Sequence, residues 1–311
     1  MLTRALGLVL GFGLDRFCGD PRRGHPVALF GQAAAALERR AYAASTGAGA
    51  AHVGLLVAPV AGLAWLVQRA AARHPVADVA WTAAVAWAVL GGRSLEREVA
   101  AVAAELERGD LPAARAQVSR VVGRDPWSLD EAGVARAAIE TLAENSSDAV
   151  VASLVWGAVA GPAGMVAHRA VNTLDAMIGH RNARYERFGK VAARADDAVN
   201  WVPARLGAAL AAGGSRAAWH AIRHDAPHHP SPNGGPIEAA FAGALGVQLG
   251  GANTYAGRAE NRGVLGAGPP PAAADVARAI RLARRVHRGS LLVTAGVAAA
   301  AGASRRLRSR W

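Results

Sequence analysis

The chain has 311 residues, a length that suits one large domain or two small ones. Hydrophobic residues make up 52% and aromatic residues only 5%, which favours an integral membrane protein over a disordered or fibrous one. The net charge of +12 comes almost entirely from arginine, because Lys190 is the only lysine. No basic run is interleaved with aromatic residues, so the charge fits anionic lipid or phosphorylated substrates and no nucleic acid is expected. The lone Cys18 excludes an internal disulfide framework and a zinc site of several cysteines.

Uncharged apolar segments recur along the chain and predict its helices. The N-terminal stretch MLTRALGLVLGFGLDRF contains an apolar run without a following small-x-small cleavage site, so we expect a retained membrane helix. Four further segments predict buried or spanning helices, at residues 53–67, 79–92, 149–167 and 289–304. Only 149–167 reaches the roughly 18 to 20 residues of a clean span. A sixth candidate, 201–215, is interrupted by Arg205.

Residues 93–145 differ from these segments because they are charged and periodic. Their apolar side chains recur at helical spacing, at Leu95, Val99, Val102 and Leu106. Ser128 stands three residues before Glu131, which predicts a capping box at the start of another helix. Alternating strand patterns are not found, so the sequence predicts an all-α, polytopic integral membrane protein. We expect a single membrane-embedded helical domain over residues 1–311, with 93–147 as a charged helical insertion on the solvent side.

Arginines predict the orientation in the membrane. Four of them fall within the final seven residues. Others lie in the expected first loop, at Arg16, Arg22, Arg23, Arg39 and Arg40. The positive-inside rule places both regions on the cytoplasmic face.

Three clusters of acids and amides have helical spacing. They are Glu144, Asn145 and Asp148; Asn172 and Asp175; and Asp196, Asp197 and Asn200. Residues three or four apart share a helix face, so each cluster can direct two oxygen ligands at one point. Mg²⁺ binds a few carboxylates plus substrate phosphate oxygens, which indicates a magnesium site for a nucleotide or a diphosphate. For any one cluster taken alone, helix capping and interfacial hydrogen bonds are the favoured explanation, but three clusters beside apolar segments favour a function.

A loop rich in proline and glycine offers a second kind of site. In HHPSPNGGPIEAAF, Pro236 falls near the first turn of a helix whose free N–H groups can hold a phosphate. Composition alone favours an ordinary loop before a proline-started helix over a phosphate site. A phosphate-loop ATPase is disfavoured, because the stretch around Lys190 lacks the first glycine of the motif and the Ser or Thr that follows the lysine. Metal binding by the histidines of HDAPHH is also disfavoured, since prolines interrupt their spacing.

Arginines and a polar loop complete the candidate groups. Four arginines, Arg181, Arg184, Arg187 and Arg194, follow NTLDAMIGH. They can bind substrate phosphate or carboxylate groups, or they can face anionic lipid headgroups, and the sequence does not separate the two. Near the N-terminus, GDPRRGHPV holds Asp20, Arg22 and His25 between two prolines, which is more rigid and polar than a linker needs.

Four long strings of the chain resemble the adenosylcobinamide-phosphate synthase family, membrane proteins of cobalamin biosynthesis. They are GDPRRGHPV, LDEAGVARAAIETLAENSSDAVVA, AVNTLDAMIGHRNARYERFGKVAARADDAVNWVPARL and HPSPNGGPIEAAFAGALGVQLGG, which together run through nearly the whole chain. Ala149, where the family pattern has Gly, and Ile237, where an aromatic residue is common, depart from it without removing a candidate polar residue.

The resemblance implies an amide-forming ligase. Such an enzyme joins the free propionate carboxyl of adenosylcobyric acid to the amine of aminopropanol or its phosphate, with ATP and Mg²⁺. It implies a multi-pass protein of the bacterial inner membrane with a cytoplasm-facing site. The implied partners are a corrinoid, a small amino alcohol or its phosphate, membrane lipid, and either a second copy of the chain or other cobalamin pathway enzymes.

This chemistry needs magnesium ligands, donors to phosphate oxygens and a base for the amine. We assign catalysis to Glu144, Asp148, Asp175 and Asp197, and metal binding to Asp175, Asp196 and Asp197. We assign substrate or phosphate binding to Asp20, His25, Asn145, Asn172, Arg181, Arg184, Asn200, Arg205, His229, Ser231, Asn233 and Glu238.

Two other functions are open to the same residues. A magnesium-dependent intramembrane transferase acting on a prenyl or lipid diphosphate also places acids at helix ends, although it usually has denser Asp-rich repeats. A non-catalytic membrane partner would use the polar clusters only to join helices and to anchor other pathway enzymes.

Overall fold

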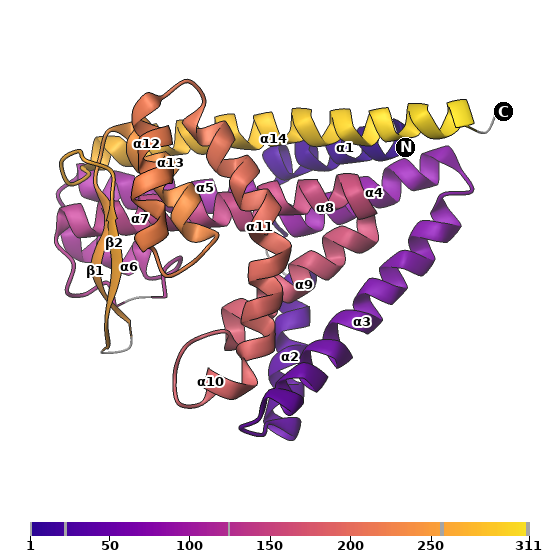
Figure 1. The fold of residues 1–311 in the computed structure, drawn as a ribbon, viewed down its shortest axis with the longest axis horizontal. Coiled ribbons are helices and arrows are strands. Elements are labelled where there is room, and N and C mark those ends of the chain that lie inside the picture. Colours follow the sequence, from indigo (N-terminus) through magenta and orange to yellow (C-terminus); the bar gives the residue numbers. More distant parts are fainter. Residues whose placement is uncertain (1, 22–23, 124, 256–257, 309–311) are drawn as a thin grey trace. The chain divides into compact units, whose positions relative to one another are not determined.

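The structure is a computed structural model that describes residues 2–21, 24–123, 125–255 and 258–308 (Figure 1). The chain divides into two compact units. Unit 1 comprises Met1–Gly91, Ala152–Asn200 and Leu291–Trp311, and unit 2 comprises Gly92–Val151 and Trp201–Ser290. Each unit therefore combines segments that are far apart in the sequence.

Unit 1 is built from helices. They are α1 (Leu2–Cys18), α2 (Pro26–Ala41), α3 (Thr46–Ala71), α4 (Pro75–Leu90), α8 (Ala152–Ala160), α9 (Pro162–Ile178) and α10 (Tyr185–Phe188). The first part of α11 (Lys190–Ala212) and the last part of α14 (Ala273–Arg308) also belong to it.

Unit 2 contains helices and one hairpin. Its helices are α5 (Gly92–Glu107), α6 (Leu111–Val118), α7 (Glu131–Asn145), the π-helix η1 (Ser146–Val151), α12 (Arg216–His224), the 3₁₀ turn η2 (Ala226–His228) and α13 (Gly234–Leu245). The hairpin pairs β1 (Leu249–Tyr255) antiparallel with β2 (Arg258–Leu265), from Leu249 opposite Leu265 to Tyr255 opposite Arg258.

Small residues let the helices of unit 1 approach closely. A Cβ atom on Gly7 would collide with Thr82, and one on Gly11 would collide with Ala86, so α1 and α4 are in direct contact. Close packing through small residues is common between helices in membranes.

The mostly helical fold agrees with the prediction, but the hairpin was missed. Glycines at positive φ, including Gly250 and Gly263, interrupt the alternation by which strands are recognised. The predicted first loop was also wrong in part, because Arg16 lies in the last turn of α1, and Arg39 and Arg40 lie in the last turn of α2. Arg22 and Arg23 lie outside the described residues.

Two helix boundaries also differ from the prediction. The predicted capping box at Ser128 is wrong, because Asp130 is the N-cap of α7 and its Oδ1 accepts the N–H of Gly133 at 2.7 Å. The segment 149–167 does not form one helix. It is divided among η1, α8 and α9, since Gly161 at φ +73° ends one helix and Pro162 starts the next.

Two helical stretches in the described part of the chain are long and apolar enough to cross a bilayer, namely α3 (Thr46–Ala71) and the combined stretch of α4 and α5 (Pro75–Glu107). They contain two of the predicted apolar segments, 53–67 and 79–92. Length and composition alone are a weak indication of a membrane span, because core helices of soluble proteins can meet the same criteria.

The first turns of α3 provide a test of close packing in unit 1. A Cβ atom on Gly49 would collide with the carbonyl oxygen of Phe188, whereas Gly47 has open space around it. We expect G49A to lower the free energy of unfolding by at least about 2 kcal/mol, because backbone must move. G47A should change it by less than about 1 kcal/mol. Equal unfolding midpoints for the two variants in detergent would contradict this packing.

Candidate functional site

Five polar side chains meet between α9 and α11 in unit 1. The Nε2 of His168 lies 2.9 Å from the Oδ1 of Asn200, whose Nδ2 donates to the Oδ1 of Asp196 at 2.9 Å. The same Asp196 oxygen accepts a hydrogen bond from the Nδ2 of Asn172 at 3.2 Å. The Nη1 of Arg169 donates to the Oδ1 of Asn172 at 3.2 Å. We call these five residues the α9–α11 network.

Helical spacing explains how the network forms. His168 and Asn172 are four residues apart on α9, and Asp196 and Asn200 are four residues apart on α11. The two pairs meet in reverse order, so the helices run antiparallel at this point. Asp196 is only 8% exposed, and a buried carboxylate is costly unless it is hydrogen-bonded. The two amides supply those hydrogen bonds.

Two further acids accompany the network. Asp197 follows Asp196 and is exposed, while Asp175 lies three residues after Asn172 and is half-buried. Partial burial raises the pKa of Asp197 above that of an ordinary aspartate, and the positive charge of Arg181 lowers it in part. Of the predicted site residues, unit 1 therefore brings Asn172, Asp196 and Asn200 into hydrogen-bonding contact and Arg181 into electrostatic range of Asp197.

Arg184 is bound by a carboxylate of the protein itself. Its Nη2 and Nε donate to the Oε1 of Glu38 at 2.8 and 3.1 Å. The hydroxyl of Tyr185 donates to the same oxygen at 3.0 Å, and the guanidinium lies 4.1 Å from the ring centre of Tyr42. The hydrogen bond to Glu38 raises the pKa of Arg184. These contacts give Arg184 a structural role besides any contact with substrate.

The predicted polar loop of unit 1 brings Asp20 near His25. The Nε2 of His25 lies 3.8 Å from the Oδ1 of Asp20, and its Nδ1 accepts the N–H of Val27 at 3.2 Å as the N-cap of α2. The indole N–H of Trp87 donates to the carbonyl oxygen of Gly19 at 2.9 Å, which joins this segment to α4.

In unit 2, His229 and Glu238 form a buried cluster with Arg262. The Nε2 of His229 lies 3.5 Å from the Oε1 of Glu238, and the Nη2 of Arg262 lies 3.4 Å from the same oxygen. Burial, together with the charge of Arg262, lowers the pKa of His229 to about 4, although the hydrogen bond to Ser231 and the charge of Glu140 oppose the shift. The imidazole is therefore neutral near pH 7, and Arg262 supplies the positive charge beside Glu238.

Glu140 ties the hairpin to α7. Its Oε1 accepts the N–H of Gly250 in β1 at 2.7 Å and lies 4.0 Å from the Nε of Arg136. Only 1% of Glu140 is exposed. A second buried glutamate thus lies close enough to His229 to affect its pKa.

The proline-rich loop uses its own N–H groups. The Oγ of Ser231 accepts hydrogen bonds from the N–H groups of Asn233 at 3.3 Å and Gly234 at 2.9 Å. The N–H of Gly235 donates to the carbonyl oxygen of Ser231 at 3.1 Å. The three backbone N–H groups that were predicted to bind a phosphate therefore form hydrogen bonds within the loop in this conformation.

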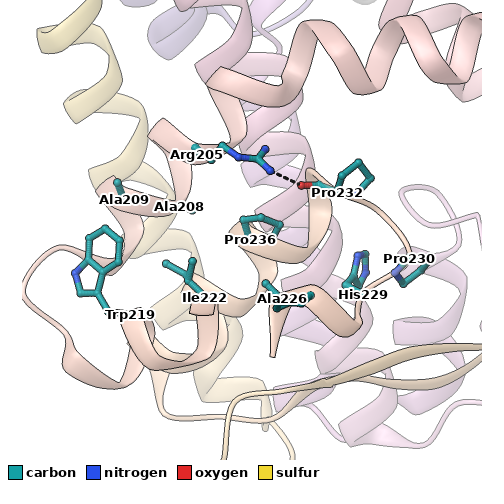
Figure 2. A pocket seen from close by; sticks show the side chains of 11 residues that line it. Arg205, Ala208, Ala209, Trp219, Ile222, Ala226, His229, Pro230, Pro232 and Pro236 are labelled. Carbon is teal, nitrogen blue, oxygen red and sulfur yellow. Dashed lines mark hydrogen bonds between the residues drawn. The ribbon is translucent and has the colours of Figure 1, made fainter. Parts of the chain in front are cut away.

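A hollow of about 630 Å³ lies beside this loop (Figure 2). Arg205 lies at its edge, where Nη2 donates to the carbonyl oxygen of Pro232 at 3.3 Å and Nη1 to the Oδ1 of Asn233 at 3.3 Å. The guanidinium also lies 4.1 Å from the ring centre of Trp201. The predicted residues Arg205, His229, Ser231, Asn233 and Glu238 are thus connected by contacts within unit 2.

The third acid and amide cluster also lies in unit 2. Glu144 and Asp148 are half-buried. The Nδ2 of Asn145 donates to the carbonyl oxygen of Thr141 at 2.9 Å. The π-helix η1 follows directly, and π turns are frequent at functional sites.

In the described part of the chain, no three His, Cys, Asp or Glu side chains are grouped to hold a metal ion by themselves. Mg²⁺ commonly binds one or two carboxylates and takes its other ligands from water and substrate phosphates. Asp175 and Asp197 carry hard oxygen donors of this kind, and the Oδ1 of Asp196 accepts hydrogen bonds from two amides.

Comparison with known proteins identifies the family. The family model described as CobD/Cbib protein matches residues 8–283. The chain belongs to the CobD/Cbib family. This confirms the resemblance found in the sequence. No solved structure matches this CobD/Cbib family member.

Curated relatives of this family member match it nearly end to end. A cobalamin biosynthesis protein CobD of Mycobacterium tuberculosis (strain ATCC 25618 / H37Rv) is 49% identical over 94% of this chain and 95% of its own length. Proteins of the same name from Chromobacterium violaceum and Rhodobacter capsulatus are each 45% identical. They cover 91% and 94% of this chain, and 93% and 96% of their own lengths.

Sequence reasoning missed several polar residues of these clusters, among them His168, Arg169, Glu140 and Arg262. His168 stands four residues before Asn172, a spacing that would have placed both on one helix face. Glu140 stands four residues before Glu144 in the same way. Arg262 gave no local signal, because its contact with Glu238 depends on the hairpin.

The α9–α11 network predicts a large cost for removing Asn200. N200A would take one hydrogen-bond partner from buried His168 and one from buried Asp196, so we expect about 2–4 kcal/mol lower unfolding free energy. The matched control is N182A, because Asn182 is exposed and its side chain makes only a local bond to the N–H of Tyr185. Chemical unfolding of both variants measures the difference, and a cost below that of N182A would refute the network's importance.

His229 predicts a pH dependence of stability. Its pKa is about 4 when folded and about 6.5 when unfolded, so the unfolded state binds more protons below pH 6.5. The free energy of unfolding should fall by up to about 3 kcal/mol as the pH falls from 6.5 to 4, and this contribution should be constant above pH 7. In H229N the dependence of the unfolding free energy on pH between 6.5 and 4 should be weaker than in the original chain. H220N, at an exposed position, should keep the original dependence. An unchanged slope in H229N would contradict the neutral, buried imidazole.

Proposed function

We propose that this CobD/Cbib family member forms an amide in cobalamin biosynthesis. It would join the free propionate carboxyl of adenosylcobyric acid to the amine of aminopropanol or aminopropanol phosphate, with ATP and Mg²⁺. Similarity over nearly the full length to proteins named cobalamin biosynthesis protein CobD supports the pathway. The observation that carries the proposal is that Asp196 is fixed in the α9–α11 network, with Asp175 and Asp197 beside network residues in the sequence.

The reaction must activate a carboxylate, which is a poor electrophile. When bound, ATP would transfer its terminal phosphoryl group to the carboxylate, which gives an acyl phosphate and releases ADP, and Mg²⁺ would neutralise the phosphate oxygens. The amine loses a proton and attacks the acyl carbon. Phosphate then leaves with one of the former carboxylate oxygens, and the amide bond remains.

Asp197 is the residue that we assign as the base for the amine. A carboxylate with a raised pKa accepts a proton more readily than an ordinary aspartate. Arg181, whose charge acts on Asp197, would hold phosphate or carboxylate oxygens in a bidentate contact. Asp175 would contribute an oxygen to Mg²⁺, while Asp196 would act as a positioning residue.

Residues of unit 2 would bind other parts of the substrates. Glu144 and Asp148 flank the start of the π-helix, and Arg205 and Asn233 lie together at the edge of the hollow. Their carboxylates, guanidinium and amide suit the amide side chains and phosphate groups of a corrinoid and an amino alcohol phosphate.

We propose further that unit 1 is embedded in the bacterial inner membrane as a multi-pass part, with the site open to the cytoplasm. Most exposed large apolar side chains among the described residues belong to unit 1, including Leu55 at 63%, Leu63 at 64% and Leu292 at 74% exposure. An apolar surface of this kind is unfavourable in water. Apolar side chains outside and a polar network inside are expected of a protein in lipid.

The direct assay uses the purified chain in detergent with adenosylcobyric acid, aminopropanol phosphate, ATP and Mg²⁺. The amide product should appear by mass only when ATP and Mg²⁺ are both present. A folded sample that forms no amide with either amine would count against the ligase. Turnover of a prenyl or lipid diphosphate without ATP would point to a transferase instead.

Asp197 gives the sharpest variant. D197N removes the base but keeps the shape of the side chain, so we expect kcat for amide formation to fall by at least about 100-fold. The matched control is E186Q, since Glu186 is an exposed acid of unit 1 outside the network. It should retain activity within about threefold. Full activity in D197N would remove this residue from the catalytic site.

A further inference from the structure

One surface of unit 2 is not used by the proposed ligase reaction, namely the outer face of α12. This nine-residue helix begins at Ser215, whose Oγ accepts the N–H of Ala218 at 3.2 Å. Its inner face is held closely against α13, because a Cβ atom on Gly243 would lie 2.5 Å from the Cα of Ala218. Ala221 is also buried. The helix is thus rigidly placed, with its larger side chains on the outside.

The outer face of α12 is basic and aromatic. Its side chains Arg216, Trp219, His220, Arg223 and His224 line a hollow of about 390 Å³. The two arginines are exposed, and they stand two helical turns apart on the same face. The acid that follows the helix, Asp225, accepts the N–H of Gly266 at 2.9 Å through its Oδ2. The rim of this hollow therefore contains cationic groups and no carboxylate.

Trp219 also lines the larger hollow, so the two hollows are neighbours. At this end the larger hollow has apolar walls, made by Ala208, Ala209 and Ile222, whereas His229 and Pro230 lie at the opposite end (Figure 2). The indole N–H of Trp219 donates to the carbonyl oxygen of Gly213 at 3.0 Å, which fixes the ring.

We propose that this face of α12 binds an anionic phospholipid. The headgroup phosphate would contact Arg216 and Arg223, because guanidinium groups bind phosphate oxygens in a bidentate manner. An acyl chain would lie past Trp219 against Ala209 and Ile222. Trp219 suits the boundary between the headgroup and the acyl chain, since indole has an apolar ring and one polar N–H.

The joined apolar and cationic hollows favour a lipid over a free phosphate. A phosphate ion would use only the arginines and leave the apolar walls exposed to water. An amphiphile with a negative head covers both surfaces and matches the charge of the rim. The acyl chain would occupy only the Trp219 end of the larger hollow, whereas Arg205 and Asn233, which we assign to substrate, lie at its edge toward Pro232. Lipid bound there would give unit 2 its own attachment to the membrane surface.

The test uses the full chain, purified in nonionic detergent and freed of lipid, with lipid adducts measured by native mass spectrometry. Dioleoyl phosphatidylglycerol should bind at least about tenfold more tightly than dioleoyl phosphatidylcholine. R216Q/R223Q should lose most of this preference. R281Q/R288Q is the matched control, because Arg281 and Arg288 are exposed arginines of unit 2 with the same seven-residue spacing. It should keep the preference.

Two further measurements distinguish a lipid site from a site for free phosphate and test whether positive charge is sufficient. Glycerol phosphate, which lacks the acyl chains, should not displace the lipid, and R216K/R223K should bind within a fewfold of the original chain. Equal losses in both glutamine variants, or no preference for phosphatidylglycerol in the original chain, would overturn the proposal. Displacement by glycerol phosphate would overturn it in favour of a free-phosphate site. If R216Q/R223Q does not fold, the lipid comparison and the displacement in the original chain decide.

Discussion

The buried carboxylate of Asp196 constrains the rest of the candidate site. A charge in a protein core is tolerated only with hydrogen-bond donors around it, and here the amides of Asn172 and Asn200 supply them from two antiparallel segments. Their spacing fixes the register of α9 against α11. Because Asp197 is the next residue along the helix, that register also fixes where Asp197 leaves the core.

Unit 1 has polar side chains in its interior and apolar side chains on its surface. The network places amides, an acid and a histidine inside, while α1, α3 and the end of α14 present exposed leucines and valines. In water this distribution would be unfavourable, but in lipid it is the stable one, since helices gain little from burying apolar side chains there. The apolar composition and the buried network therefore have one explanation if unit 1 is embedded in a bilayer.

Helical periodicity predicted much of this fold, because residues three or four apart share a face wherever the helix continues. The amphipathic pattern from Leu95 to Leu106 lies within α5, and the spacing of Asp196 and Asn200 predicted two of the five network residues. Local signals failed where a contact between distant segments decides the outcome. The bond between Glu140 and Gly250 exists only when the hairpin has formed, and nothing near Arg262 indicates that Glu238 is its partner. At 149–167, the uninterrupted apolar composition led to the prediction of one helix, whereas Gly161 and Pro162 divide the segment.

The central claim is that the protein activates a carboxylate as an acyl phosphate before the amine attacks. The most direct measurement follows the oxygen atoms of adenosylcobyric acid labelled with ¹⁸O in its free carboxylate, during turnover with ATP and aminopropanol phosphate. We predict that one ¹⁸O per amide formed is recovered in inorganic phosphate, with ADP as the other product. Amide formation with the label in AMP, or with no label in any phosphate, would contradict the account.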